Sequence, residues 1–134
     1  MNQFEGNIVQ IHSCGQLSIV TVELLDRNKV QSIIIDTSDT APYLVLDTPV
    51  FVLFKETEVA ISPEENPKIS LQNRFRGKIT AIEKGELLVR LSIETAAGNL
   101  VSMISKTALT DLDLFINDWV TALVKLNEIT LSPK

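Results

Sequence analysis

One short sequence motif occurs twice in the chain. The stretch "NQFEGNIVQI" from Asn2 and the stretch "NRFRGKITAI" from Asn73 share Asn, Phe, Gly and Ile at the same spacing, 71 residues apart. Further identities follow at this offset. One residue then drops out near the middle of the second copy, and the offset becomes 70 up to the pair Pro63/Pro133. Sixteen identities in one order with a single gap predict that the chain folds as two copies of one small unit.

A polar segment with two prolines, "SPEENPK" from Ser62 to Lys68, separates the two copies and is typical of a linker. We therefore divide the chain into a first unit of residues 1–63, a linker of residues 64–69, and a second unit of residues 70–134. The first unit is the more divergent copy. In this alignment Ser105 of the second unit corresponds to Ile34, or to Thr37 or Ser38 if the register slips.

Most of each unit shows the pattern of strands. In "ELLVRLSIE" apolar residues alternate with residues of the opposite face, which is the period of a half-buried strand. The stretches "DRNK" and "TAAGN" have the composition of hairpin turns. One segment per unit has a helical pattern, "SKTALTDL" from Ser105 and, more weakly, "DTSDTAPYLVL" from Asp36. We therefore predict an all-β protein with one short helix per unit, made of two tandem OB-like barrels.

The composition excludes several functional classes. The net charge of −5 and the aromatic content of 5% argue against a nucleic-acid partner, which needs clustered cations and stacking surfaces. No apolar run is long enough to span a membrane, and a single cysteine, Cys14, permits no internal disulfide, so a cytoplasmic location is expected. His12 and Cys14 would share a strand face, but two ligands do not make a metal site. No Ser-His-Asp arrangement can be assembled with any specificity around the single histidine, and we expect neither a cofactor nor an enzyme.

The second unit resembles a known family over nearly its full length. The stretches "SLQNRFRGKITAIEKGE", "LVSMISKTALTDL" and "VTALVKLNEITL" are similar to the Mop (molbindin) or TOBE domain, which binds molybdate and tungstate. The family opens with Ser-Ala-Arg-Asn, and the Ser-x-x-Asn frame is present here as Ser70 to Asn73. The resemblance implies a tandem di-Mop protein that assembles as a homo-oligomer, most often a trimer, with oxyanion sites between units.

The resemblance also implies a set of binding residues. These residues are Ser70 and Gln72 of the opening motif, Ser105 and Lys106 at the helix start, Lys125 of a late strand, and its equivalent Lys55 in the first unit. The chemistry agrees with this set, because a tetrahedral dianion needs several convergent hydroxyl, amide and cationic donors.

Two departures from the family motif are visible. Gln72 stands in the arginine position, which removes a bidentate cationic donor, and Arg74, Arg76 or Lys106 are the nearest cations that could compensate. The first unit has no serine or arginine ahead of Asn2, so only Lys55 of the family's binding residues is clearly present there. We therefore expect fewer or weaker sites than two intact copies would give.

The leading hypothesis from the sequence is reversible binding of molybdate or tungstate for intracellular storage or homeostasis. One alternative is the ligand-sensing module of a molybdate-responsive transcription regulator or transporter. Another is a degenerate Mop pair that serves only as an assembly module, which Gln72 and Ile34 favour. A third, single-stranded nucleic-acid binding by an OB-like barrel, is disfavoured by the acidic charge.

Overall fold

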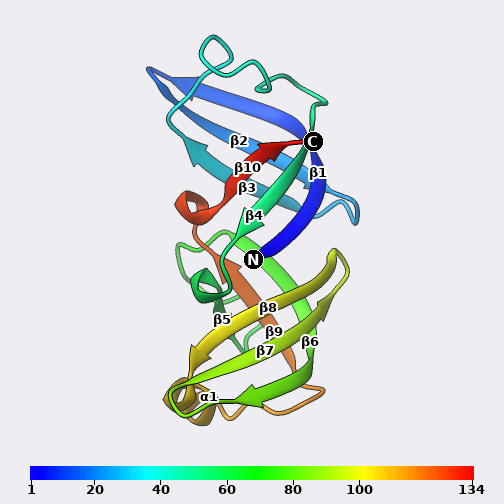
Figure 1. Cartoon of the computed structure of the whole chain (residues 1–134), viewed down its shortest axis with the longest axis vertical. Coiled ribbons are helices and arrows are strands. Elements are labelled where there is room, and N and C mark those ends of the chain that lie inside the picture. Colours follow the sequence, from blue (N-terminus) through cyan, green and yellow to red (C-terminus); the bar gives the residue numbers. More distant parts are fainter.

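The computed structural model describes all 134 residues and arranges them as two five-stranded antiparallel sheets stacked end to end (Figure 1). The first sheet has the order β10-β4-β1-β2-β3 and the second has the order β5-β9-β6-β7-β8. The strands of the first sheet are β1 (Asn2–Cys14), β2 (Leu17–Leu24), β3 (Lys29–Ile34), β4 (Pro49–Phe54) and β10 (Thr130–Pro133). Those of the second sheet are β5 (Ala60–Ser62), β6 (Asn73–Lys84), β7 (Leu88–Thr95), β8 (Gly98–Ser105) and β9 (Trp119–Val124). The prediction of a mainly β protein is confirmed.

The two sheets exchange their last strands. β5 follows the first sheet in the chain but pairs with β9 of the second, with Ala60 opposite Leu123. β10 is the last strand of the chain and pairs with β4 of the first sheet, with Thr130 opposite Leu53. Each sheet is therefore completed by a strand from the other half of the chain. The predicted boundaries at residues 63 and 70 concern the sequence repeat and stay a prediction.

Both long first strands carry the same irregularity. The pairing of β1 with β2 shifts between Ile8 and Gln10, and that of β6 with β7 shifts between Ile79 and Ala81. Such a bulge bends a strand and increases its twist, which allows one strand to pair along two different neighbours. The repeat observed in the sequence is thus also a repeat of backbone geometry.

The structure corrects the alignment of the two copies. Glu23 pairs with Lys29 across five intervening residues, whereas its equivalent Glu94 pairs with Asn99 across four. The offset therefore changes from 71 to 70 in this hairpin turn, earlier than the sequence identities suggested. The equivalent of Ser105 is consequently Ile35 and not Ile34.

One hydrophobic core extends through both halves of the molecule. Phe4, Phe54 and Phe75 lie at its centre, with ring centroids 5.2 to 5.8 Å apart. Rings at this separation interact favourably beyond the area they bury. The two units therefore do not have separate cores.

The second unit contains the only α-helix, α1 (Lys106–Leu112), which starts at the predicted N-cap Ser105. The helix predicted from Asp36 in the first unit is wrong, because that segment forms turns. There the Thr40 hydroxyl donates to the Asp36 carboxylate and the Ser38 hydroxyl donates to the Leu44 carbonyl, so side chains compete with helical bonding. Pro42 also disfavours a helical residue before it. Short 3₁₀ turns follow the fourth and ninth strands, η1 (Glu56–Glu58) and η2 (Leu126–Glu128).

Trp119 is 54% exposed at the start of β9, where the Lys78 ammonium lies 5.5 Å from its ring centroid. Met103 in β8 is partly buried. None of the helices is both long enough and apolar enough to cross a membrane.

Candidate functional site

Ser105 and Lys106 lie where β8 ends and α1 begins. The Ser105 hydroxyl oxygen accepts a hydrogen bond from the Ala108 amide at 3.0 Å, and the Lys106 amide donates to the Leu87 carbonyl at 2.9 Å. A serine hydroxyl also carries its own proton, so Ser105 can cap the helix and still donate to a ligand. The side chains of both residues are exposed, and Lys106 lines an open hollow of about 450 Å³ together with Thr107 and Thr110.

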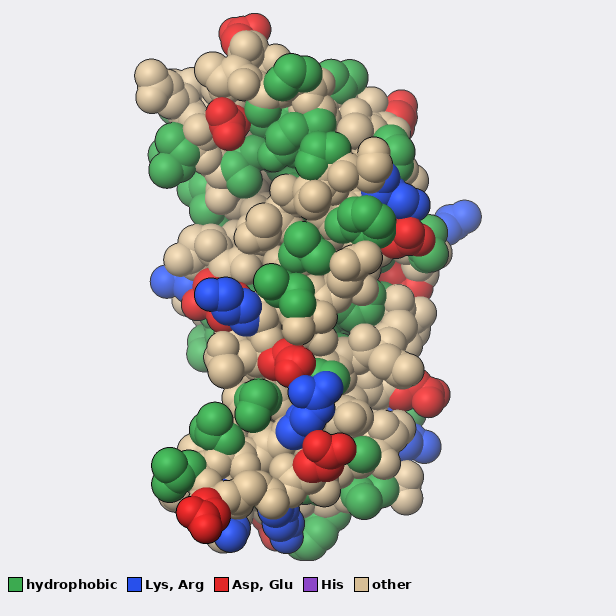
Figure 2. Space-filling view, viewed as in Figure 1, with side chains coloured by type: hydrophobic (Ala, Val, Ile, Leu, Met, Phe, Trp, Pro, Cys, Tyr) green, Lys and Arg blue, Asp and Glu red, His purple; other side chains and the backbone are tan.

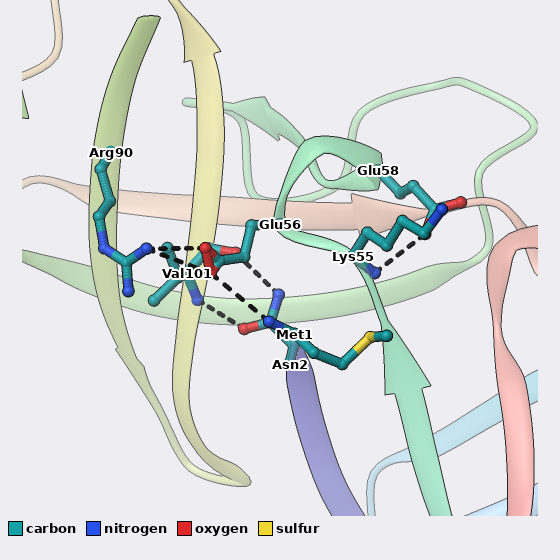
Figure 3. A network of polar contacts seen from close by, with 7 residues as sticks. All are labelled: Met1, Asn2, Lys55, Glu56, Glu58, Arg90 and Val101. Atoms are coloured by element: carbon teal, nitrogen blue, oxygen red, sulfur yellow. Dashed lines mark hydrogen bonds and ion pairs between the residues drawn. The ribbon is translucent and has the colours of Figure 1, made fainter. Parts of the chain in front are cut away.

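Lys125 and Lys55 occupy equivalent positions directly after β9 and β4. Both side chains are exposed, so neither charge is buried within its apolar strand. Each residue opens a 3₁₀ turn, because its carbonyl accepts from the amide of Glu128 or Glu58 at 2.9 or 3.0 Å. The Lys55 amide in addition donates to the Glu58 carboxylate at 2.9 Å (Figure 3).

A hollow of about 260 Å³ places Lys125 beside the opening motif of the second unit. Its lining includes Lys125 and Leu71, the residue between Ser70 and Gln72, together with Glu58 and Glu128. Ser70 and Gln72 are exposed and make no hydrogen bond within the chain, so their side chains are free to bind a ligand. The two carboxylates oppose anion binding, since they outnumber the single cation.

The main chain next to this motif is firmly held. The side chain of Asn73 exchanges two hydrogen bonds with the backbone of Gln31, at 2.7 and 2.8 Å. Asn2 makes the same pair of bonds with Val101, at 2.8 Å each (Figure 3). The repeated asparagine therefore joins each opening strand to the other sheet. In the second unit it holds the chain in place directly after the segment Ser70 to Gln72.

The predicted residues do not all meet within one chain. Lys125 and Leu71 of the opening motif line one hollow, whereas Lys106 lines a separate hollow that shares no residue with it, and Ser105 lines neither. Lys55 lines neither hollow. Beside it, the Glu56 carboxylate forms ion pairs with Arg90 at 2.7 Å and with the Met1 ammonium at 3.7 Å (Figure 3). None of the predicted oxyanion-binding residues takes part in these ion pairs.

Sequence reasoning missed a third hollow, of about 400 Å³, at the junction of the two sheets. Arg27, Arg74 and Arg76 line it together. Arg74 and Arg76 were named only as neighbours of Gln72, and Arg27 was not singled out at all. No local signal connects Arg27 to the other two, because it comes from a hairpin turn of the other unit.

Comparison with known proteins supports the family assignment. Residues 69–131 match the TOBE domain family. The whole fold is similar to that of the cytoplasmic molybdate-binding protein ModG in a molybdate-bound form, with a TM-score of 0.92 and 20% sequence identity over 99% of this chain and 96% of that one.

Two smaller proteins cover less of the chain. A molybdate-binding protein from Sporomusa ovata is 36% identical over 44% of this chain and 88% of its own, with a TM-score of 0.42. MopII from Clostridium pasteurianum is 29% identical over 43% and 88%, with the same TM-score. A search of curated protein sequences found no significant match. From the TOBE match in its second half and the ModG-like fold of the whole, the chain is a tandem TOBE/Mop-domain protein.

Proposed function

We propose that this protein binds molybdate or tungstate reversibly in the cytoplasm and acts as a store or buffer rather than as an enzyme. The observation that supports this best is the position of Lys125 beside the segment Ser70 to Gln72, in a chain whose whole fold is similar to that of a molybdate-bound protein. A cation, a free hydroxyl and an amide side chain are suitable donors for a tetrahedral dianion.

The proposed site takes its remaining donors from a second copy of the chain. Lys106 lines a hollow separate from that of Lys125, and Ser105 lines neither of them, so one chain does not surround the ligand with all of these residues. A neighbouring copy in a homo-oligomer, for which we propose a trimer, would supply the Ser105 hydroxyl and the Lys106 ammonium. The second cation would replace the charge that Gln72 lacks.

Exposed apolar side chains support such an assembly. Val45 and Leu46 are 55% and 56% exposed, and their equivalents Phe115 and Ile116 are 61% and 53% exposed. In Figure 2 apolar side chains gather over the upper part of the molecule, the end where the loop from β3 to β4 lies in Figure 1. Large exposed apolar groups at equivalent places of both units are typical of surfaces that contact a partner.

Calorimetric titration of the intact oligomer with molybdate, tungstate, sulfate and phosphate tests the proposal. We expect binding of at least one of the first two, and weakening of about tenfold or more in Lys125→Ala, because a charge-assisted bond is lost. Lys134→Ala, which removes an exposed cation directly after β10 that lines neither hollow of the site, is the matched control. Lys55→Ala should affect only the weaker site that the first unit would form around its equivalent of Lys125. Absence of heat with both molybdate and tungstate, or an unchanged affinity in Lys125→Ala, would refute the site.

A second function has one observation in its favour. The hollow around Lys125 contains two carboxylates and Gln72 lies next to it, which suits an assembly module that no longer binds the oxyanion. Sedimentation of the protein with and without molybdate separates the two functions. An oligomer that is intact and binds no oxyanion would favour assembly alone.

A further inference from the structure

The hollow at the junction of the two sheets is formed by parts of the chain that are far apart in sequence. Its lining comes from the turn between β2 and β3, the segment after β5, strands β6 and β9, and the turn between β7 and β8. We call it the junction hollow and define it by Asp26, Arg27, Glu65, Arg74, Arg76 and Thr121. Three arginines face two carboxylates, so the lining is cationic although the whole protein carries a charge of −5.

The arginines keep most of their donors free. Arg74 uses Nε and one terminal nitrogen on the carbonyls of Leu71 and Ile69, at 2.9 and 3.1 Å. Arg76 uses one terminal nitrogen on the Thr121 hydroxyl at 3.1 Å and the Glu64 carbonyl at 3.3 Å. A guanidinium has five N–H donors, so each retains at least one terminal nitrogen for a further acceptor.

No carboxylate neutralises these three cations. The ion pairs of the structure join Glu56 to Met1 and Arg90, and Glu5 to Lys134. Asp26 instead accepts from the Asn28 amide at 3.1 Å, and the Arg27 guanidinium makes no hydrogen bond within the chain, since the only bond that this residue donates runs from its backbone amide to the Leu24 carbonyl. Unpaired guanidinium groups that converge on one hollow are suited to bidentate binding of a phosphate or a similar group.

The equivalent place in the other unit lacks these features. Gln3, Glu5 and Phe51 stand where Arg74, Arg76 and Thr121 stand in the second unit, and the Lys134 ammonium binds Glu5 at 2.9 Å. The junction hollow is therefore not part of the repeated design. It is also distinct from the proposed molybdate site, because the two hollows share no lining residue.

We propose that the junction hollow binds a small organic phosphate, with the phosphate group held by Arg27, Arg74 and Arg76. Its volume of about 400 Å³ lies within the range of roughly 300–1,000 Å³ that is usual for small-molecule sites, and one tetrahedral oxyanion would fill only part of it. Ala96 and Ala97 line the remainder and provide an apolar surface for the organic group.

Titration of the full chain with adenosine monophosphate, glycerol phosphate, inorganic phosphate and molybdate at low ionic strength tests this. We expect one of the two esters to bind more tightly than inorganic phosphate, with affinity falling as salt is added. Arg27→Ala should weaken that binding about tenfold or more, because a charge-assisted bond to the phosphate is lost. The Arg27 guanidinium makes no hydrogen bond within the chain, so the fold should not change. Arg27→Lys should recover part of the loss, since it restores the charge without the bidentate geometry.

Two controls keep this test separate from the molybdate proposal. Lys84→Ala should leave ester binding unchanged, and so should Lys125→Ala. Ester binding that is absent, that is equal in Arg27→Ala and the original protein, or that is no tighter than binding of inorganic phosphate would overturn the inference. Loss of molybdate binding in Arg27→Ala would also overturn it, because the hollow would then be the molybdate site.

Discussion

The two units are most alike where they are buried. Ser32 and Ser102 are both inaccessible to solvent, and their hydroxyls donate to the carbonyls of Ile129 and Val59 at 2.7 and 2.8 Å. Asn2 and Asn73 likewise make matching pairs of backbone hydrogen bonds across the junction. Buried polar groups must be satisfied, so a change at one of these positions is costly in either unit.

The units differ most at exposed positions that could contact a ligand. Ser105 corresponds to Ile35, which is 77% exposed, and Arg76 corresponds to Glu5. Solvent-exposed positions tolerate such changes at little cost in stability. Duplication of the fold has therefore not duplicated the donors, and the second unit carries most of the groups able to bind an anion.

The largest effect should come from the aromatic centre that both units share. Phe75→Ala should lower the free energy of unfolding by about 3–5 kcal/mol, and Phe4→Ala should do the same, because each removes a buried ring from one common core. Urea denaturation followed by far-ultraviolet circular dichroism measures both. Because the sheets exchange strands, we expect a single transition in the original protein, and two transitions would contradict a shared core.

The matched serines give the next largest effect. Ser32→Ala and Ser102→Ala should each destabilise by about 1–3 kcal/mol, because each leaves a buried carbonyl without its donor. The same denaturation experiment applies. Costs that agree within about 0.5 kcal/mol would support the corrected alignment, with its offset of 70 in β3 and β8. A negligible cost in one unit alone would show that the two bonds are not equivalent.

Much of the fold was predictable from the sequence because it depends on local patterns. Strand alternation, the turns at "DRNK" and "TAAGN", and the cap at Ser105 all depend on neighbouring residues. The exchange of β5 and β10 was not predictable, since a short strand such as "AIS" pairs equally well with the edge of either sheet. The helix was wrongly predicted from Asp36 because apolar spacing does not register competing Ser, Thr and Asp side chains.

The candidate site was predictable only in part. The motif run indicated Ser70, Lys125 and Ser105 one by one, but whether they meet depends on the fold of the whole chain. The structure places Leu71, the neighbour of Ser70, beside Lys125, and places Lys106, the neighbour of Ser105, in a different hollow. Arg27 shows the opposite case. Its sequence context is an ordinary turn, and it lines the same hollow as Arg74 and Arg76 only because the turn between β2 and β3 lies beside β6.

The helix cap in the second unit should have a smaller effect than the matched serines. Ser105→Ala should cost about 1 kcal/mol in stability, because the Ala108 amide loses its acceptor. Ile35→Ala, at the equivalent position without a helix, is the control and should not show the loss of stability that comes from the missing cap. Equal losses in the two variants would mean that the cap contributes nothing, and that Ser105 is free for a role in binding alone.

The smallest effect concerns Tyr43, which occupies the place of the helix end in the second unit. Burial raises the pKa of the Tyr43 phenol above its ordinary value of 10.0, and the Asp36 carboxylate raises it further. A raised pKa favours the neutral phenol in the folded state. This stabilisation is therefore fully present below pH 10.0 and is lost as the pH rises through the higher folded value.

Tyr43→Phe should abolish this alkaline dependence, so the difference in unfolding free energy between the original protein and the variant should change only above pH 10.0. The chain has one tyrosine, so the ultraviolet absorbance of tyrosinate follows this group alone. A titration midpoint at or below 10.0 in the folded protein would contradict the burial of the phenol. Asp36→Asn should move the midpoint partly back, since burial is the larger cause and the carboxylate the smaller one.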